Sequence, residues 1–82
     1  MNTFRMSNVS LRDMRMALKK LGFEKCNVSK GRGGHEKWVK NGMQRPIIVQ
    51  THKDPVPEHI VRQIMRHLDF TRDEFKDLLQ SL

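Results

Sequence analysis

The stretch GRGGHEKWVKNG, residues 31–42, places a glycine-rich turn, a short strand and a second turn in direct succession. Successive side chains of a strand point to opposite faces of its sheet, so the order of HEKWVK decides which groups are buried. Trp38 is the largest apolar group here, and we expect it to face the helices together with Glu36 and Lys40. The alternation therefore predicts an open sheet face that carries the other side chains, His35, Lys37 and Val39.

Turn signals on both sides of this segment predict a three-stranded antiparallel sheet. Asn41-Gly42 is a strong hairpin signal, because both turn positions tolerate a positive φ. Pro46 lies near the start of the third strand and suggests an edge position or a strand end. The expected strands are Phe23–Ser29, His35–Lys40 and Arg45–Thr51.

Helical periodicity outside the sheet predicts three helices. The first runs over Ser10–Leu21, where Gly22 can adopt the left-handed conformation that ends a helix. The second begins at Pro57 and ends near Asp69, and the third opens with the capping box of residues 71–74. The buried stripes are expected at Leu11, Met14, Leu18 and Leu21, then at Ile60, Val61, Ile64, Met65 and Leu68, and finally at Phe75, Leu78, Leu79 and Leu82. The order α-β-β-β-α-α indicates an α+β fold with the helices on one face of the sheet.

Length and charge restrict the class of protein. A chain of 82 residues predicts one small domain over residues 1–82, with residues 1–9 polar and irregular. The net charge of +7 and the pI of about 10.2 favour an anionic partner, most often nucleic acid, although a merely soluble basic protein has the same composition.

The sequence also gives an expectation about the compartment. No apolar run approaches the roughly 20 residues of a membrane span, and the N-terminus lacks the apolar middle of a signal peptide. Cys26 is the single cysteine, so it cannot form an internal disulfide, and we expect it to be a small buried side chain. These features predict a cytoplasmic protein.

His35 is the candidate for chemistry, because it follows a glycine turn on the expected open face. RNA carries its own nucleophile, and the 2′-OH attacks the adjacent phosphodiester when a base removes its proton. Histidine titrates near neutrality and can act as that base or as an acid, while a lysine stabilises the charged phosphorane. The candidate RNA contacts around His35 are Lys30, Arg32, Gly33, Gly34, Lys37, His52 and Lys53.

Simpler interpretations of the same residues stay open. His35 could be a surface histidine, the glycines an ordinary flexible loop, and the lysines a solvated face. A zinc site from His52, His59 and His67 is not expected, because no cysteine or cluster of carboxylates completes the ligand set. The sequence therefore predicts neither a metal site nor a cofactor.

From Ser10 to about Leu79 the chain resembles the HicA (YcfA-like) toxins of bacterial toxin–antitoxin systems. The motifs are a Leu-Gly-Phe junction after the first helix, a Gly-Ser-His signature at the second strand, an aliphatic third strand ending near a histidine, and a Lys-Asp loop before a helix. In this sequence they correspond to residues 21–23, 33–35, 49–52 and 53–54, followed by Ile60, Ile64 and the segment TRDEF at 71–75. Each motif is weak alone, but their order and spacing are fairly specific.

The resemblance implies a fold like the double-stranded RNA-binding domain, α-β-β-β-α with an additional C-terminal helix here. It implies an endoribonuclease that cleaves mRNA with the signature histidine, which is His35, and a HicB-type antitoxin that masks the site. One position departs from the family pattern, since Gly34 replaces the usual serine. Many relatives have a second histidine at the position of Glu36, and relatives with Glu there are also familiar.

Three hypotheses follow from the sequence. The first is an RNA-cleaving toxin held inactive by an antitoxin, and the second is a non-catalytic RNA-binding module that uses the same basic face. The third is a small assembly protein whose open sheet face, with Val39 and either Ile47 or Val49, serves only for association.

Overall fold

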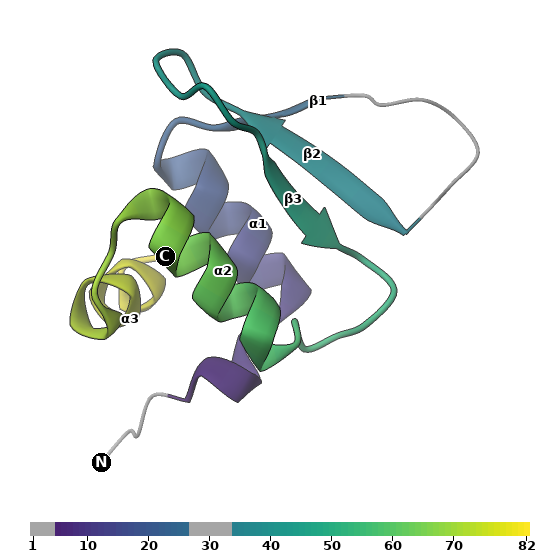
Figure 1. The fold of residues 1–82 in the computed structure, drawn as a ribbon. Helices are drawn as coiled ribbons and strands as arrows, with labels where there is room; N and C mark the ends of the chain where they lie inside the picture. Colours follow the sequence, from purple (N-terminus) through teal and green to yellow (C-terminus); the bar gives the residue numbers. More distant parts are fainter. Residues whose placement is uncertain (1–4, 27–33) are drawn as a thin grey trace.

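The computed structural model of the chain describes residues 5–26 and 34–82 and has helices and strands in the expected order (Figure 1). In the described part of the chain, a short 3-10 turn and one helix precede the strands, and two helices follow them. The elements are η1 (Met6–Asn8), α1 (Leu11–Lys20), β1 (Glu24–Cys26), β2 (His35–Val39), β3 (Ile47–Gln50), α2 (Glu58–Leu68) and α3 (Arg72–Gln80). This is the α+β arrangement of a double-stranded RNA-binding domain with an added C-terminal helix, as predicted.

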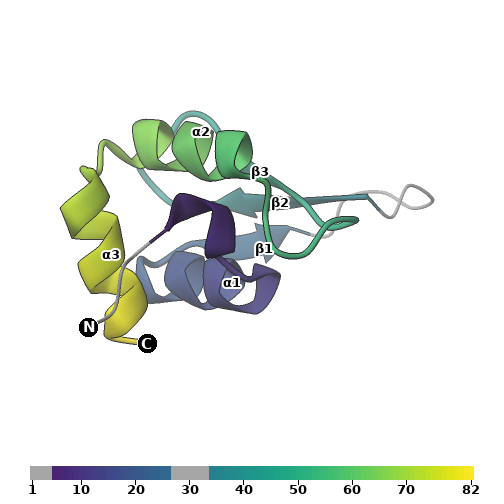
Figure 2. The same cartoon turned by 90° about the horizontal axis from the view of Figure 1, so that it is seen from below.

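The sheet is antiparallel with β2 in the centre, in the order β1-β2-β3. Trp38 lies opposite Lys25 in β1 and opposite Ile47 in β3. Helices α1 and α2 cover one face of the sheet, and α3 lies at the end of this pair away from the strands (Figures 1 and 2). In the described part of the chain, no helix covers the other face of the sheet, which is called the open face below.

The core lies between the sheet and the two covering helices. Trp38 is 1% exposed, and Val49 of β3 is fully buried beside it in the core. The helices contribute side chains at the expected positions: Leu11, Met14, Leu18, Ile60, Val61, Ile64, Met65 and Phe75. The prediction that Trp38 faces the helices is therefore confirmed.

Helix ends are fixed by the signals found in the sequence. The Ser10 side chain accepts a hydrogen bond from the Asp13 backbone N–H at 3.0 Å and caps α1. Gly22 has φ +95°, and the Phe23 N–H donates to the Leu18 carbonyl, which closes the helix. At α3, Thr71 and Glu74 form the complete capping box.

Some boundaries and side chains differ from the expectations. Strand β3 begins after Pro46, because proline cannot donate a ladder hydrogen bond. Met6–Asn8 form a 3-10 turn, and Val9, which the sequence placed in an irregular segment, is 2% exposed. Leu82 was predicted to be buried, but it follows the last turn of α3 and is exposed. No helix within the described ranges is long and apolar enough to span a membrane.

Candidate functional site

The open face of the sheet carries the residues that the alternation of β2 predicted. His35 and Val39 are exposed, and Lys37 is half-buried. In antiparallel pairing, residues opposite each other share a face, so Ile48 lies beside Lys37 and Gln50 beside His35. On the other side, β1 adds Cys26, which lies opposite Lys37.

Two sequence-based predictions about this sheet were wrong. Ile47 and Val49 are buried on the helix side, and the exposed aliphatic residue of β3 is Ile48, with 46% of its surface accessible. Cys26 is exposed and not buried, because its register with Lys37 turns its side chain to the open face. Both errors come from the register between strands, which the sequence alone did not determine.

His35 and His52 come together at one end of this face. Their ring centroids are 6.5 Å apart, and the ring planes meet at 68° in an edge-on arrangement. A backbone hydrogen bond from the Thr51 N–H to the Gly34 carbonyl, 2.9 Å long, joins the two chain segments just before each histidine. The two imidazoles are thus held as neighbours although 17 positions separate them in the sequence.

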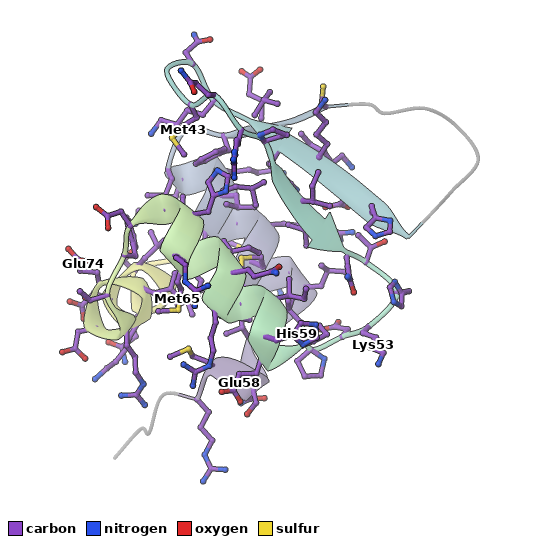
Figure 3. The ribbon with its side chains drawn as sticks, in the orientation of Figure 1. Met43, Lys53, Glu58, His59, Met65 and Glu74 are labelled. Atoms are coloured by element: carbon purple, nitrogen blue, oxygen red, sulfur yellow. The ribbon has the colours of Figure 1, made fainter. Side chains whose placement is uncertain are left out.

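Some of the other predicted RNA contacts lie in the described part of the chain, and others do not. Lys53 is exposed on the loop between β3 and α2, next to His52 (Figure 3). Lys37 lies on the same sheet face as His35. The predicted contacts Lys30, Arg32 and Gly33 lie outside the described residues.

The loop that carries His52 and Lys53 is tied to the start of α1. The Leu11 N–H donates to Asp54 Oδ1 at 2.9 Å, and the Val56 N–H donates to the Val9 carbonyl at 2.8 Å. Asp54 therefore satisfies one of the free N–H groups at the helix N-terminus. Sequence reasoning missed this contact, because the two partners are 43 positions apart and neither has a local signal for the other.

Glu36 anchors β2 to α1 on the opposite face from His35. Arg15 donates to both of its carboxylate oxygens, at 2.6–3.1 Å, and the Trp38 indole N–H donates to Oε1 at 3.2 Å. The Lys25 Nζ lies 3.9 Å from Glu36 Oε2. The Glu36 side chain is only 11% exposed, so it is a structural acceptor that joins β2 to α1.

This environment lowers the pKa of Glu36. Burial by itself raises that pKa, but the hydrogen bonds from Arg15 and Trp38 and the charges of Arg15 and Lys25 outweigh it. The pKa of Arg15 is raised, chiefly by its hydrogen bond to Glu36. Both shifts favour the ionised pair.

The remaining histidines lie apart from the His35–His52 pair. His59 is exposed in the first turn of α2 (Figure 3), and His67 near its end donates from Nε2 to the Arg45 carbonyl at 3.2 Å. Within residues 5–26 and 34–82, no three His, Cys, Asp or Glu side chains are grouped as metal ligands would be.

The arrangement provides the groups for acid–base chemistry on an anion. One neutral imidazole can accept a proton while a neighbouring imidazolium donates one, and Lys37 supplies a positive charge on the same face. Gly34 adds no side chain that would keep a polymer backbone away from His35.

Comparison with known proteins gives one family. A family model described as the HicA toxin of bacterial toxin–antitoxin systems matches residues 11–70, which is more than half of the chain and includes both histidines of the site. No curated protein and no solved structure matches.

The Glu36 pair predicts a specific dependence of stability on pH. Because the folded-state pKa of Glu36 is lowered, the pair stabilises the fold above the unfolded-state pKa of about 4.3 and loses this effect as the pH falls through the folded-state pKa. Glu36→Gln should lower the free energy of unfolding by about 1–2 kcal/mol at pH 7. Urea unfolding at several pH values should show the variant and the parent converging in acid.

A matched control for this measurement is Glu24→Gln. Glu24 is exposed on β1 and makes no ion pair within the described part of the chain. Its loss should change the free energy of unfolding by less than about 0.5 kcal/mol. An equal effect of both variants, or a constant gap between Glu36→Gln and the parent down to low pH, would contradict the role of the pair.

Position 34 offers a second test of the site. Among the described residues, a Cβ on Gly34 meets only His52 Nδ1, at 3.5 Å, which is ordinary contact. Gly34→Ser should therefore fold normally and donate its hydroxyl to His52 Nδ1, which fixes the proton of the neutral ring on Nε2. Nitrogen NMR of the imidazoles should show this change at His52 and no change at His59. In Gly34→Ala, neither histidine should change. An unchanged His52 in Gly34→Ser would contradict the geometry.

Proposed function

The chain belongs to the HicA toxin family of bacterial toxin–antitoxin systems. From this premise we propose that it is an endoribonuclease that cleaves mRNA, with His35 as the catalytic residue. The observation that carries the proposal is the His35–His52 pair, with ring centroids 6.5 Å apart on a sheet face that also holds Lys37. The net charge of +7 supports an RNA substrate, and we place the reaction in the cytoplasm.

In the proposed mechanism, neutral His35 takes the proton of a ribose 2′-OH. The 2′-oxygen then attacks the adjacent phosphorus, and Lys37 stabilises the charge that develops on the phosphorane. The bond to the 5′-oxygen breaks, and His52 as imidazolium donates a proton to that oxygen. The products are a 2′,3′-cyclic phosphate and a free 5′-hydroxyl, so the atoms and protons balance without a metal.

The proposed partner is a HicB-type antitoxin that covers the same face. Val39 and Ile48 are exposed there beside Lys37, and a partner that combines acidic and apolar groups is complementary to such a surface. Covering His35 would exclude RNA directly. Binding would also stabilise a small domain by mass action.

A second candidate function is a non-catalytic RNA-binding module on the same basic face. Lys37 and the exposed aliphatic side chains beside it can contact RNA whether or not His35 transfers a proton. Cleavage by the purified protein separates the two, because a binding module retains RNA intact.

The catalytic assignment predicts a large loss of activity in His35→Ala. Removing a positioned proton-transfer group should lower the cleavage rate by about 10²–10⁴-fold without changing the fold. His52→Ala should also lower the cleavage rate, because it removes the proposed proton donor to the leaving oxygen. The measurement is cleavage of a labelled single-stranded RNA by protein freed of antitoxin, with analysis of the product ends.

His59→Ala is the matched control, since His59 is an exposed histidine outside the pair. It should retain the parent rate, and EDTA should leave the rate unchanged. Equal cleavage by His35→Ala and the parent would remove His35 from the mechanism. A 5′-phosphate product would show that water, and not the 2′-OH, attacks.

The partner assignment predicts that antitoxin and RNA exclude each other. The His35→Ala protein should bind both ligands separately, and saturating antitoxin should displace the RNA. Hydrogen exchange should slow at residues 35–39 in the complex and stay unchanged at the exposed turns of α3. Simultaneous binding of both, with residues 35–39 equally exposed, would mean that the antitoxin acts from a distance.

A further inference from the structure

A second basic region lies outside the His35–His52 pair, between the outer edge of β3 and helix α2. The hollow there has a volume of about 530 Å³. Its lining residues are Arg45, Pro46, Ile47, Ile48, Gln63, Ile64, Arg66 and His67. Three of them are cationic or can become so, and no carboxylate of residues 5–26 and 34–82 lines the hollow.

The two arginines are available to a ligand. Arg45 and Arg66 are exposed, and neither makes an ion pair with an acidic side chain in residues 5–26 and 34–82. The hydrogen bond from His67 Nε2 to the Arg45 carbonyl holds the backbone before β3 against the last turns of α2. Both arginines line this one hollow. A guanidinium binds a phosphate through two parallel N–H groups, which suits successive phosphates of a nucleic acid.

The hollow is continuous with the open face of the sheet. Ile48 lines the hollow and also lies opposite Lys37 on the open face. His35 pairs with Gln50, two residues further along β3, so Ile48 lies about 7 Å along the strand from the level of His35. In Figure 3, Met43 and Lys53 lie at opposite ends of the sheet.

We propose that this hollow is a second RNA-binding subsite, which holds backbone phosphates of the single strand on one side of the cleavage point. The proposal rests on the proposed function, and it adds the path of the substrate. The strand would run from His35 over Lys37 and Ile48 to Arg45 and Arg66. An acidic protein segment also fits the charge, but the continuity through Ile48 and Lys37 favours the polymer bound at His35.

The test uses the full chain with His35→Ala, so that RNA is bound without being cleaved. The variant Arg45→Ala/Arg66→Ala is compared with its parent on a labelled single-stranded RNA of about 12 nucleotides. The matched control is Arg12→Ala/Lys19→Ala, because these two exposed cations lie on α1, which does not line the hollow. Circular dichroism and melting temperature confirm that each variant folds.

The hollow variant should bind RNA about tenfold more weakly at low salt, since two charge-assisted contacts are lost. The plot of log association constant against log salt concentration, between about 50 and 200 mM, should become less steep by about 1.4. This corresponds to roughly 0.7 for each of two lost phosphate contacts of a single strand. The control should keep the parent affinity and slope.

Several outcomes overturn the proposal. Parent affinity and slope in the hollow variant would show that RNA does not reach the hollow, as would an equal loss in the control. Unchanged RNA binding combined with lost antitoxin binding would identify the hollow as a protein interface. If the His35→Ala parent itself binds no RNA, the proposed function fails first, and that result is distinct from failure of the hollow alone.

Discussion

The burial of Trp38 sets the orientation of every other side chain in strand β2. With its indole 1% exposed in the core, the alternation of the strand turns His35 and Lys37 to the open face. Because β2 is central, its neighbours follow in register, and Ile48 joins the same face. A slip of one residue would bury His35 and expose Trp38, so the packing of the core and the exposure of the candidate site are one constraint.

Helix α1 then holds the two halves of the site in place. Arg15 binds Glu36, next to His35, and the first N–H of the helix binds Asp54, two residues after His52. A hydrogen bond between partly exposed groups contributes about 0.5–1.5 kcal/mol, against a total stability of about 5–15 kcal/mol for a typical domain. The spacing of the two histidines therefore depends on a helix that contributes no side chain to the open face.

Local patterns predicted the fold well because they act over a few residues. The helix caps at Ser10, Gly22 and Thr71, and the inward direction of Trp38, depend only on neighbouring positions. His35 was also recognised as a candidate from its own segment.

Features that depend on distant partners could not be predicted in this way. The exposure of Cys26 and Ile48 follows from strand register, and the cap at Asp54 joins segments far apart in the sequence. The basic hollow is formed by Arg45 and Arg66, which have no shared motif and meet only when α2 packs beside β3. The structural role of Glu36 was not predicted, because it requires Arg15 from another element.

The central claim is that RNA lies on the open face of the sheet, and NMR with a substrate that cannot react tests it most directly. An all-deoxy single strand lacks the 2′-OH, so it can bind to the unaltered protein without being cleaved. The account predicts that the backbone amide signals of His35, Lys37 and Ile48 shift on titration, while those of Arg12 and Lys19 on α1 stay unchanged. Shifts confined to α1, with β2 and β3 unaffected, would contradict it.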